Sequence, residues 1–431
     1  MKKEILLIAF SCLSLHFGWA QFTLDGELRP RTEYRNGFGS IIPDSLDAGF
    51  ATSTRVRLNA GYQTETYQLY LSLQDVLVWG ENRQLFPADL NNSFAIFEAW
   101  ARLKLGSGFS TKLGRQVISY DDQRIFGGVD WTQQARNHDA ALLSYQEGTL
   151  MIDLGLAFNQ DFSNPAGFQS AGTTYNTTGF FSYKAMEYLY LKKQWDTFSG
   201  SLLALNSGFQ NFNANGGGDG TSNLQTFGAH LTYKKGGFGA AANAYIQTGE
   251  RQGALDVGGA YLLGLDLNYQ ATDKINLGLG TEIISGNKPG TAGKTEAFFP
   301  LYGTNHKFNG FMDYFYVGNH ANSVGLFDLH ASANFDLGRK SGLLLKVLNF
   351  SGEQELPSGE KSLGTEVDLV FSKSFNGYGL KIGYSHLFAS DGMYELKGVS
   401  KADAAGSQNW AWAMLVIKPK FLNTAGEGTD H

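Results

Sequence analysis

The sequence has almost no cysteine and little proline. Its single cysteine, Cys12, lies in an amino-terminal apolar stretch that we expect to be cleaved off. The mature chain then has no thiol, which excludes a disulfide framework and any metal site built from cysteines. Only 8 prolines accompany 54 glycines and an aromatic content of 14%. This mixture is unusual for a helical enzyme and typical of one long antiparallel sheet.

The amino terminus has the features of a secretory leader. Lys2 and Lys3 precede an apolar run at 5–17, which is too short to span a bilayer. The tripeptide Gly18-Trp19-Ala20 then places small residues at the two positions that a signal peptidase reads. We therefore predict a signal peptide over residues 1–20 and a mature chain that begins at the next residue.

The rest of the chain lacks long hydrophobic runs and a strong charge of one sign. No run of about 20 apolar residues follows the leader, so the sequence predicts no transmembrane helix. The net charge of −6 is mild and negative, so nucleic acid is not an expected partner. Because no linker, charge block or composition shift divides the chain, we expect one domain over 21–421 and a polar tail at 422–431.

Strict alternation of polar and apolar residues runs through most of the chain. Residues 55–60 (RVRLNA) and 327–337 (FDLHASANFDL) are examples. This period of two indicates strands with one polar and one apolar face. We predict about 18 strands, at residues 22–36, 51–63, 66–79, 95–105, 110–119, 138–146, 149–159, 177–193, 197–209, 223–235, 237–248, 257–271, 274–286, 322–337, 341–351, 362–375, 378–390 and 409–421.

The connections between these strands alternate in length. Short ones, such as 64–65 and 376–377, alternate with long ones, such as 37–50 and 287–321. A closed up-and-down barrel in an outer membrane gives this pattern, with short periplasmic turns and long extracellular loops. An open sheet would expose two long edges, and a soluble β-helix or propeller would need a repeat of fixed period, which is not seen. The predicted fold is an all-β transmembrane antiparallel barrel of about 18 strands.

The polar faces of the strands predict a charged lumen, because the apolar faces must meet lipid. A barrel of about 18 strands leaves an aqueous channel unless loops plug it. Clustered arginines in such a pore attract carboxylates and phosphates. The simpler alternative is that the lumenal charges only solvate one another. The charged residues that we expect in the lumen on the first, second and fourth strands include Arg29, Arg31, Arg55, Arg57, Glu98, Arg102 and Lys104.

Charged residues are concentrated at 114–143, which raises the question of an active site. Asp121 and Asp122 are neighbours, and on an extended chain they point to opposite sides, so they do not share one site. His138 and Asp139 are compatible with a hydrolase, but no serine is marked by its spacing. Calcium-loop spacing is also missing. We predict no catalytic residue, metal or cofactor, and keep a barrel-embedded hydrolase and a loop cation site as weaker alternatives.

Two long loops bear on whether the pore is open. The sequence leaves two arrangements open for 120–137: it folds inward and pins itself by ion pairs, or it faces water and lipopolysaccharide. The loop at 287–321 includes the aromatic residues Phe298, Phe299, Phe308, Phe311, Tyr314 and Phe315. It is too apolar to stand in water, so we expect it to pack over or into the barrel mouth.

Two segments resemble the alginate export family of outer-membrane proteins. The first consists of Gly114-Arg115-Gln116, Asp122, Arg124, Asp130-Trp131 and 136–139, and the second covers 304–308 and 310–315. The resemblance implies a monomeric 18-stranded barrel whose arginine-rich lumen passes an anionic uronate polymer. It also implies that Arg115, Arg124 and Arg136 belong to the pore lining or its constriction. We expect the acidic partners of the arginines to be Asp122, Asp130, Asp139 and Glu98.

Arg115 does not fit simple strand parity. It shares a face with Leu113 and Val117, which point to lipid, so a β-bulge near Gly114 is needed to turn it inward.

These patterns together predict a passive outer-membrane channel for anionic or polar solutes in a Gram-negative bacterium. Export of an anionic polysaccharide is the form that the family resemblance suggests. The alternatives are a general diffusion porin, a hydrolase in a barrel and a plugged structural or receptor barrel. We expect the chain to act as a monomer in contact with lipid and lipopolysaccharide. The substrate and the direction of transport do not follow from the sequence.

Overall fold

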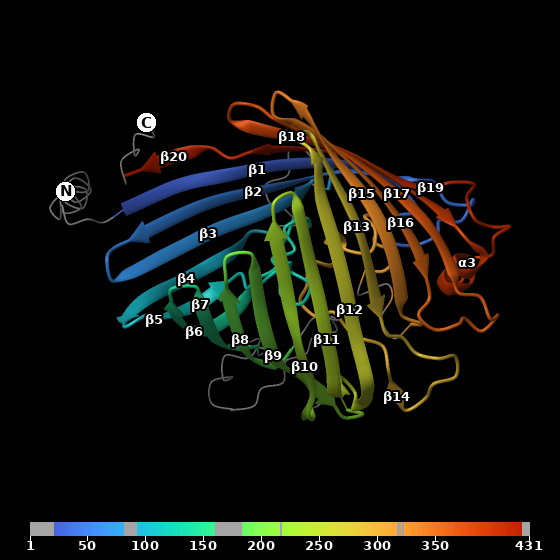
Figure 1. Cartoon of the computed structure of the whole chain (residues 1–431), viewed down its shortest axis with the longest axis horizontal. Coiled ribbons are helices and arrows are strands. Elements are labelled where there is room, and N and C mark those ends of the chain that lie inside the picture. Colours follow the sequence, from blue (N-terminus) through green and yellow to red (C-terminus); the bar gives the residue numbers. More distant parts are fainter. Residues whose placement is uncertain are drawn as a thin grey trace.

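The protein is a closed antiparallel β-barrel, seen here in a computed structural model (Figure 1). The structure describes residues 21–81, 93–159, 183–215, 218–316, 320 and 323–424. Across these ranges, 18 strands form the barrel wall. The wall strands are β1 (Gln21–Asn36), β2 (Gly49–Gln63), β3 (Tyr67–Val78), β4 (Ala95–Gly106), β5 (Phe109–Gln116), β6 (His138–Glu147), β7 (Leu150–Phe158), β8 (Ala185–Gln194), β9 (Phe198–Phe212), β10 (Gly218–Lys235), β11 (Phe238–Arg251), β12 (Leu255–Thr272), β13 (Ile275–Ile284), β15 (Leu326–Gly338), β16 (Ser341–Ser351), β17 (Ser362–Ser374), β18 (Tyr378–Ala389) and β19 (Gln408–Ile417). The shorter elements are β14 (Lys294–Thr295), η2 (Asn305–Lys307), α3 (Asp391–Lys397) and β20 (Lys420–Asn423).

The wall is closed by hydrogen bonding between its first and last strands. Each wall strand pairs antiparallel with its neighbours along the chain, and β1 pairs with β19 from Leu28↔Ile417 to Asn36↔Asn409. The short β14 lies parallel to β12, so β13 pairs directly with β15. Closure leaves no free sheet edge. A bilayer requires this, because its interior offers no water to unpaired backbone groups.

The predicted strand count and up-and-down topology are confirmed, whereas several predicted boundaries were off by three to eight residues, including the starts of β10 and β15. The strand predicted at 110–119 ends at Gln116, because the chain turns into the barrel there. The strand predicted to start at 177 starts at Ala185, and 160–182 lie outside the described residues. The strand predicted at 409–421 is divided between β19 and β20, because Pro419 has no N–H to donate to the ladder.

The two chain ends lie at the end of the barrel that carries the short turns. The start of β1 and the end of β20 are on this side, and α3 lies at the opposite end (Figure 1). Leu422 and Asn423 still pair with β1. The predicted leader at 1–20 and residues 425–431 of the predicted tail lie outside the described residues. No helix of the described chain is long and apolar enough to cross a membrane.

The outer face of the barrel is apolar and carries aromatic rings near the short turns. On β15, Leu329 and Leu337 are exposed on this face, whereas Asp328 is buried inside. Such alternation is what an outer-membrane barrel requires, and aromatic girdles mark its interfaces. The ring pairs beside the short turns are Tyr62–Tyr67, Phe109–Tyr145, Trp195–Phe198, Tyr233–Phe238 and Phe375–Tyr378.

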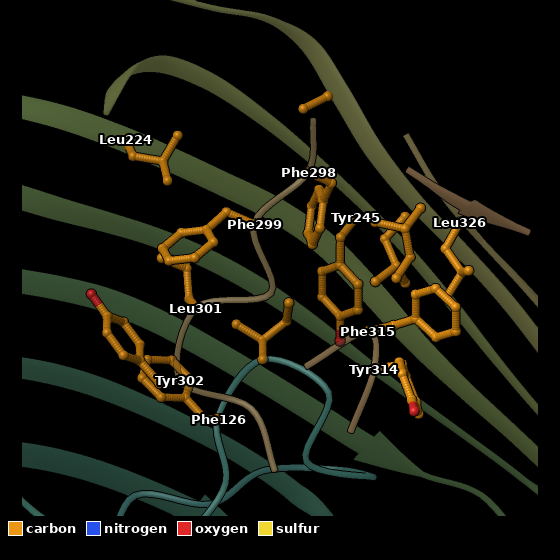
Figure 2. Close-up of a cluster of buried hydrophobic side chains, with 14 of the residues drawn as sticks. Phe126, Leu224, Tyr245, Phe298, Phe299, Leu301, Tyr302, Tyr314, Phe315 and Leu326 are labelled. Atoms are coloured by element: carbon orange, nitrogen blue, oxygen red, sulfur yellow. The ribbon is translucent and has the colours of Figure 1, made fainter. Parts of the chain in front are cut away.

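Two long loops fold into the barrel and meet there. The first inner loop, 117–137, connects β5 to β6, and the second inner loop, 285–325, connects β13 to β15. Phe126 of the first loop stacks on Tyr302 of the second with ring centroids 5.6 Å apart. Their side chains pack with those of the wall strands in the apolar cluster drawn in Figure 2. The predicted packing of the second loop into the barrel is therefore confirmed, and the first loop takes the inward of its two predicted arrangements.

A charge on the outer face should be costly in proportion to its depth in the bilayer. Leu279→Arg, in the middle of β13, should lower the free energy of unfolding by about 2–4 kcal/mol, whereas Leu337→Arg, beside the β15–β16 turn, should cost about 0–1 kcal/mol. Urea unfolding of the barrel in lipid vesicles measures both values. Equal costs at the two depths would contradict this placement of the membrane.

Candidate solute path

The first inner loop turns sharply because several of its residues adopt the left-handed conformation. Asp121, Gln123 and Val129 have φ angles of 49°, 73° and 49°. Gly127 leaves no space for a side chain, since a Cβ atom there would lie 2.2 Å from Thr304 Oγ1. Such backbone geometry persists only where the surroundings hold it. Here it is held by the second inner loop on one side and by β1 and β2 on the other.

Arginines on β1 and β2 anchor this loop. We call the set the arginine wall; its members are Arg29, Arg31, Arg55 and Arg57. Arg55 donates to Glu27 Oε1 through Nε at 2.7 Å, and its Nη2 lies 2.8 Å from Asp130 Oδ1. Arg29 donates to the backbone oxygens of Asp130 at 2.7 Å and Thr132 at 2.9 Å. The planar guanidinium supplies several donors in fixed directions, which suits it to hold a folded backbone.

The arginine wall faces the barrel interior, as the sequence predicted. Its side chains are mostly buried, whereas the lining of an open pore would be exposed to water. Arg55 is 0% exposed and Arg29 is 4% exposed. Arg57 donates to Gln74 at 2.7 Å and lies over the ring of Phe97 at 3.7 Å. The wall therefore lies mostly beneath the first inner loop. Its role in solute passage stays a prediction.

An aromatic contact joins the two inner loops on the β1–β19 side of the barrel. The guanidinium of Arg31 lies 4.4 Å from the ring centroid of Trp131 and donates to the Trp131 oxygen at 2.6 Å. Trp131 stacks on His306 of the second loop, with centroids 4.5 Å apart and planes at 13°. It also meets Trp412 of β19 edge-on at 4.8 Å. These stacked and edge-on contacts pack the two loops against β1 and β19.

Asp121 and Asp122 separate onto different parts of the wall, as the sequence predicted. Asp121 accepts hydrogen bonds from Tyr190 at 2.7 Å and Ser201 at 2.6 Å. Asp122 accepts from Asn243 on β11 at 2.6 Å and from the backbone N–H of Arg124 at 3.1 Å. The prediction that Asp122 is the partner of an arginine side chain was wrong, because its carboxylate faces β10 and β11.

Arg124 forms a buried ion pair with the far wall. It donates to both carboxylate oxygens of Glu282 on β13, at 2.6 and 2.8 Å. Asn305 and Asn309 of the second inner loop each accept a further hydrogen bond from it at 3.0 Å. Its side chain is 1% exposed. Arg124 therefore fastens the first inner loop to the wall and is not open to solvent; its place in a pore constriction stays a prediction.

Arg136 lies where the two inner loops meet. Its Nη1 donates to the Gly303 oxygen at 3.3 Å, and its backbone N–H donates to the Gly128 oxygen at 2.8 Å. Burial lowers the pKa of Arg136, and the nearby hydroxyls of Tyr316 and Tyr302 partly oppose this shift. Its predicted place in a constriction stays a prediction.

The second inner loop has its own anchors on β17 and α3. The backbone N–H of Met312 donates to Glu366 Oε1 at 2.9 Å. Gly310 has a φ of 90°, and a Cβ atom there would lie 2.6 Å from Glu366 Oε2. Lys397 at the end of α3 donates to the Tyr314 oxygen at 2.5 Å. Burial against the loop lowers the pKa of Lys397 to about 8.

Arg115 was assigned wrongly to the pore lining. Its ladder partner is Asp139, with no register shift at Gly114, so the bulge needed to turn it inward is missing from the described strands. Arg115 and Asp139 form an exposed bidentate pair at 2.8 and 2.9 Å on the outer face. Simple strand parity placed Arg115 correctly, and the family resemblance did not.

The remaining predicted residues lie on β4. Glu98, Arg102 and Lys104 are on the inward parity of the strand, and Arg102 and Lys104 are exposed toward the periplasmic mouth. Glu98 accepts a hydrogen bond from Trp100 at 2.8 Å. It forms no ion pair with an arginine within the described chain, so its predicted role as an arginine partner was wrong.

His138, the candidate residue of the hydrolase alternative, makes a structural contact. His138 shares a hydrogen bond of 2.8 Å with Tyr183 and is buried, as expected of a structural histidine. Among the described residues, no group of three or more His, Cys, Asp or Glu residues is placed to hold a metal.

Some of the residues that shape the interior have no signal in the sequence. Gln133 donates to Ser53 and accepts from Arg29, and both contacts span many residues of sequence. A neutral glutamine in a loop looks like any solvent-exposed residue. Glu282 carries the right parity for the lumen, but its partner lies 158 residues away.

The closed ladder, apolar outer face, aromatic girdle and charged interior together define an outer-membrane β-barrel of the porin class. Residues 21–407 match the sequence model of the alginate export family, and the chain belongs to that family. A search of curated proteins finds no match.

Solved porin structures share the fold. Acinetobacter baumannii OccAB4 has a TM-score of 0.62 at 13% identity, over 94% of this chain and 98% of that chain. Pseudomonas aeruginosa OccK9 (OpdG) has a TM-score of 0.62 at 12% identity, over 93% and 98%. Pseudomonas aeruginosa OpdK with vanillate has a TM-score of 0.59 at 12% identity, over 92% and 99%. At such low identities the similarity concerns the fold alone.

The ion pair of Arg124 should be critical for keeping the first inner loop in place. Arg124→Ala leaves the carboxylate of Glu282 buried without its partner, so the free energy of unfolding should fall by about 3–5 kcal/mol. Arg115→Ala removes an exposed pair and should cost about 1 kcal/mol or less. Urea unfolding in lipid vesicles compares the two variants. Similar losses in both would show that Arg124 does not anchor the loop.

Proposed function

We propose that this protein is a passive outer-membrane channel for anionic or polar solutes, with an anionic saccharide as the solute class that its family suggests. The observation that carries the proposal is the pair of exposed, inward-facing cations Arg102 and Lys104 on β4, beside the arginine wall that the first inner loop covers. Fixed guanidinium groups in a confined pore favour carboxylates and phosphates and disfavour small cations. We further propose that the chain loses residues 1–20 and acts as a monomer among lipid and lipopolysaccharide.

One observation favours a general diffusion porin as the second candidate. Glu27, Glu33 and Asp130 pair with arginines on β1 and β2 at 2.5–3.3 Å. These carboxylates compensate much of the positive charge. A pore with compensated charge selects weakly among small solutes, so ion selectivity separates the two candidates.

The exposed cations at the periplasmic mouth offer the cleanest test of selectivity, because they support no inner loop. In a planar bilayer with a salt gradient, the wild-type channel should be anion-selective. Arg102→Glu with Lys104→Glu should lower the anion-to-cation permeability ratio by about threefold or more, since a unit charge about 7 Å from an ion in water is worth roughly 0.6 kcal/mol. The reversal potential reports this ratio.

The matched control places the same charge change on the short turns, outside the lumen. Lys274→Glu with Arg339→Glu should leave the reversal potential close to that of the wild type, because these residues lie on the β12–β13 and β15–β16 turns. A cation-selective wild type, or equal shifts in both double variants, would refute an anion path past β4.

A further inference from the structure

A cavity in the periplasmic half of the barrel lies beside the contacts that anchor the first inner loop. Its volume is about 250 Å³. That is below the range of about 300–1,000 Å³ of pockets for drug-sized ligands, so it suits one small solute. Its wall includes the polar residues Glu27, Arg29, Asp130, Ser372, Lys381 and Lys418.

The position of the cavity makes it reachable from the periplasm. On β19 its wall consists of Met414 and Val416, whereas the aromatic contact of Trp131 meets the same strand higher up, at Trp412. Ser374, also in its wall, is the last residue of β17 before the β17–β18 turn. The cavity therefore lies between the packed inner loops and the periplasmic mouth.

Lys381 supplies a charge that the protein itself leaves uncompensated. Its ladder partners are Ser372 and Met414. Met414 is buried inside, whereas the next residue, Ile382, is exposed on the lipid face, so Lys381 faces inward. It forms no hydrogen bond or ion pair with any residue of the described chain. An unpaired ammonium group in a partly enclosed cavity attracts an anion.

The carboxylates in the cavity wall do not cancel this charge. Glu27 and Asp130 are paired with Arg29, at 3.9 and 3.3 Å, and with Arg55, at 2.5 and 2.8 Å. Lys418 approaches Glu27 at 3.3 Å. The cations Arg29, Lys373, Lys381 and Lys418 of the wall, with Arg55 beside it, outnumber the two carboxylates, so the cavity keeps a net positive charge.

The rest of the wall is suited to a sugar ring. Met414 and Val416 present an apolar surface, and the hydroxyls of Ser372 and Ser374 lie on the neighbouring strands. A pyranose ring has an apolar face and hydroxyl edges, so it matches a wall with both kinds of surface. A carboxylate on such a ring would complement the positive charge of Lys381.

We propose that this cavity is a binding site for a single uronate unit, with Lys381 as the group that pairs with its carboxylate. The inference rests on the proposed function for its solute class, because a channel for anionic saccharides needs a first contact at its mouth. The unit is either a free uronic acid or the end of a uronate chain, which share the same chemistry.

Binding of sodium glucuronate to the full mature barrel in detergent micelles, measured by calorimetry, tests the site without requiring conduction. The wild type should bind it, and Lys381→Gln should bind about tenfold more weakly through loss of one charged contact. Lys381→Arg, which keeps the charge, should stay within about threefold of the wild type. The neutral methyl ester of glucuronate should bind the wild type about tenfold more weakly, a comparison that needs no variant.

The control is Lys274→Gln, which removes the same charge from the β12–β13 turn and should bind like the wild type. No glucuronate binding by the wild type, or equal binding by Lys381→Gln and the wild type, overturns the proposal. If the site receives a chain end, a uronate trimer binds with the same dependence on Lys381; if it receives only the free acid, the trimer does not. Either result with the trimer supports the proposed site, provided that glucuronate binding depends on Lys381.

Planar-bilayer recordings separate this site from the proposed function. Glucuronate added on the periplasmic side should reduce the current more than glucuronate added on the other side, and this asymmetry should disappear in Lys381→Gln. If the channel is anion-selective but glucuronate blocks it equally from both sides, and Lys381→Gln does not change the block, the binding site is refuted and the proposed function stands. If the protein does not conduct at all, the proposed channel function is refuted. Calorimetry then still tests whether the cavity binds glucuronate.

Discussion

The requirement that every backbone N–H and C=O group be paired governs this structure, because the bilayer interior provides no alternative partner. The pairing of β1 with β19 satisfies it by closing the ladder. Closure fixes which side chains point outward, since alternation along a strand leaves no choice once one face meets lipid. The apolar outer face, the aromatic girdle and the inward position of the arginine wall all follow from this constraint. Pro419 interrupts this pairing, because it has no N–H group, and the last strand is divided into β19 and β20 there.

Inside the barrel, buried charge pairs determine where the inner loops lie. Arg55 and Arg124 are almost completely buried, and each needs its carboxylate partner to offset the loss of water. Arg55 on β2 contacts Asp130 of the first inner loop, and Arg124 of that loop contacts Glu282 on β13, so the loop is held from two sides. The aromatic contacts of Phe126 with Tyr302 and of Trp131 with His306 then join the two loops into one packed unit.

This arrangement divides the cations of the interior into two functional groups. The arginine wall is largely committed to Glu27, Glu33 and Asp130, and it serves structure first. Arg102, Lys104 and Lys381 are placed nearer the periplasmic mouth and have no ion-pair partner in the described chain. We expect these less constrained cations to make the first contact with an anionic solute, because a charge that is already paired and buried attracts a passing ion weakly.

Strand parity alone determined the barrel, the strand count and the face of almost every wall residue, including Arg115, because alternation is a local property of the chain. Family resemblance placed Arg115 in the lumen wrongly. Only the tertiary structure decided that the first inner loop folds inward, that Asp122 faces β11, and that Lys381 stands unpaired in a cavity. Each of these depends on contacts between segments far apart in sequence, such as Arg124 and Glu282 at a separation of 158 residues. No local pattern specifies such a pair, because its energy depends on burial that arises only when the barrel is closed.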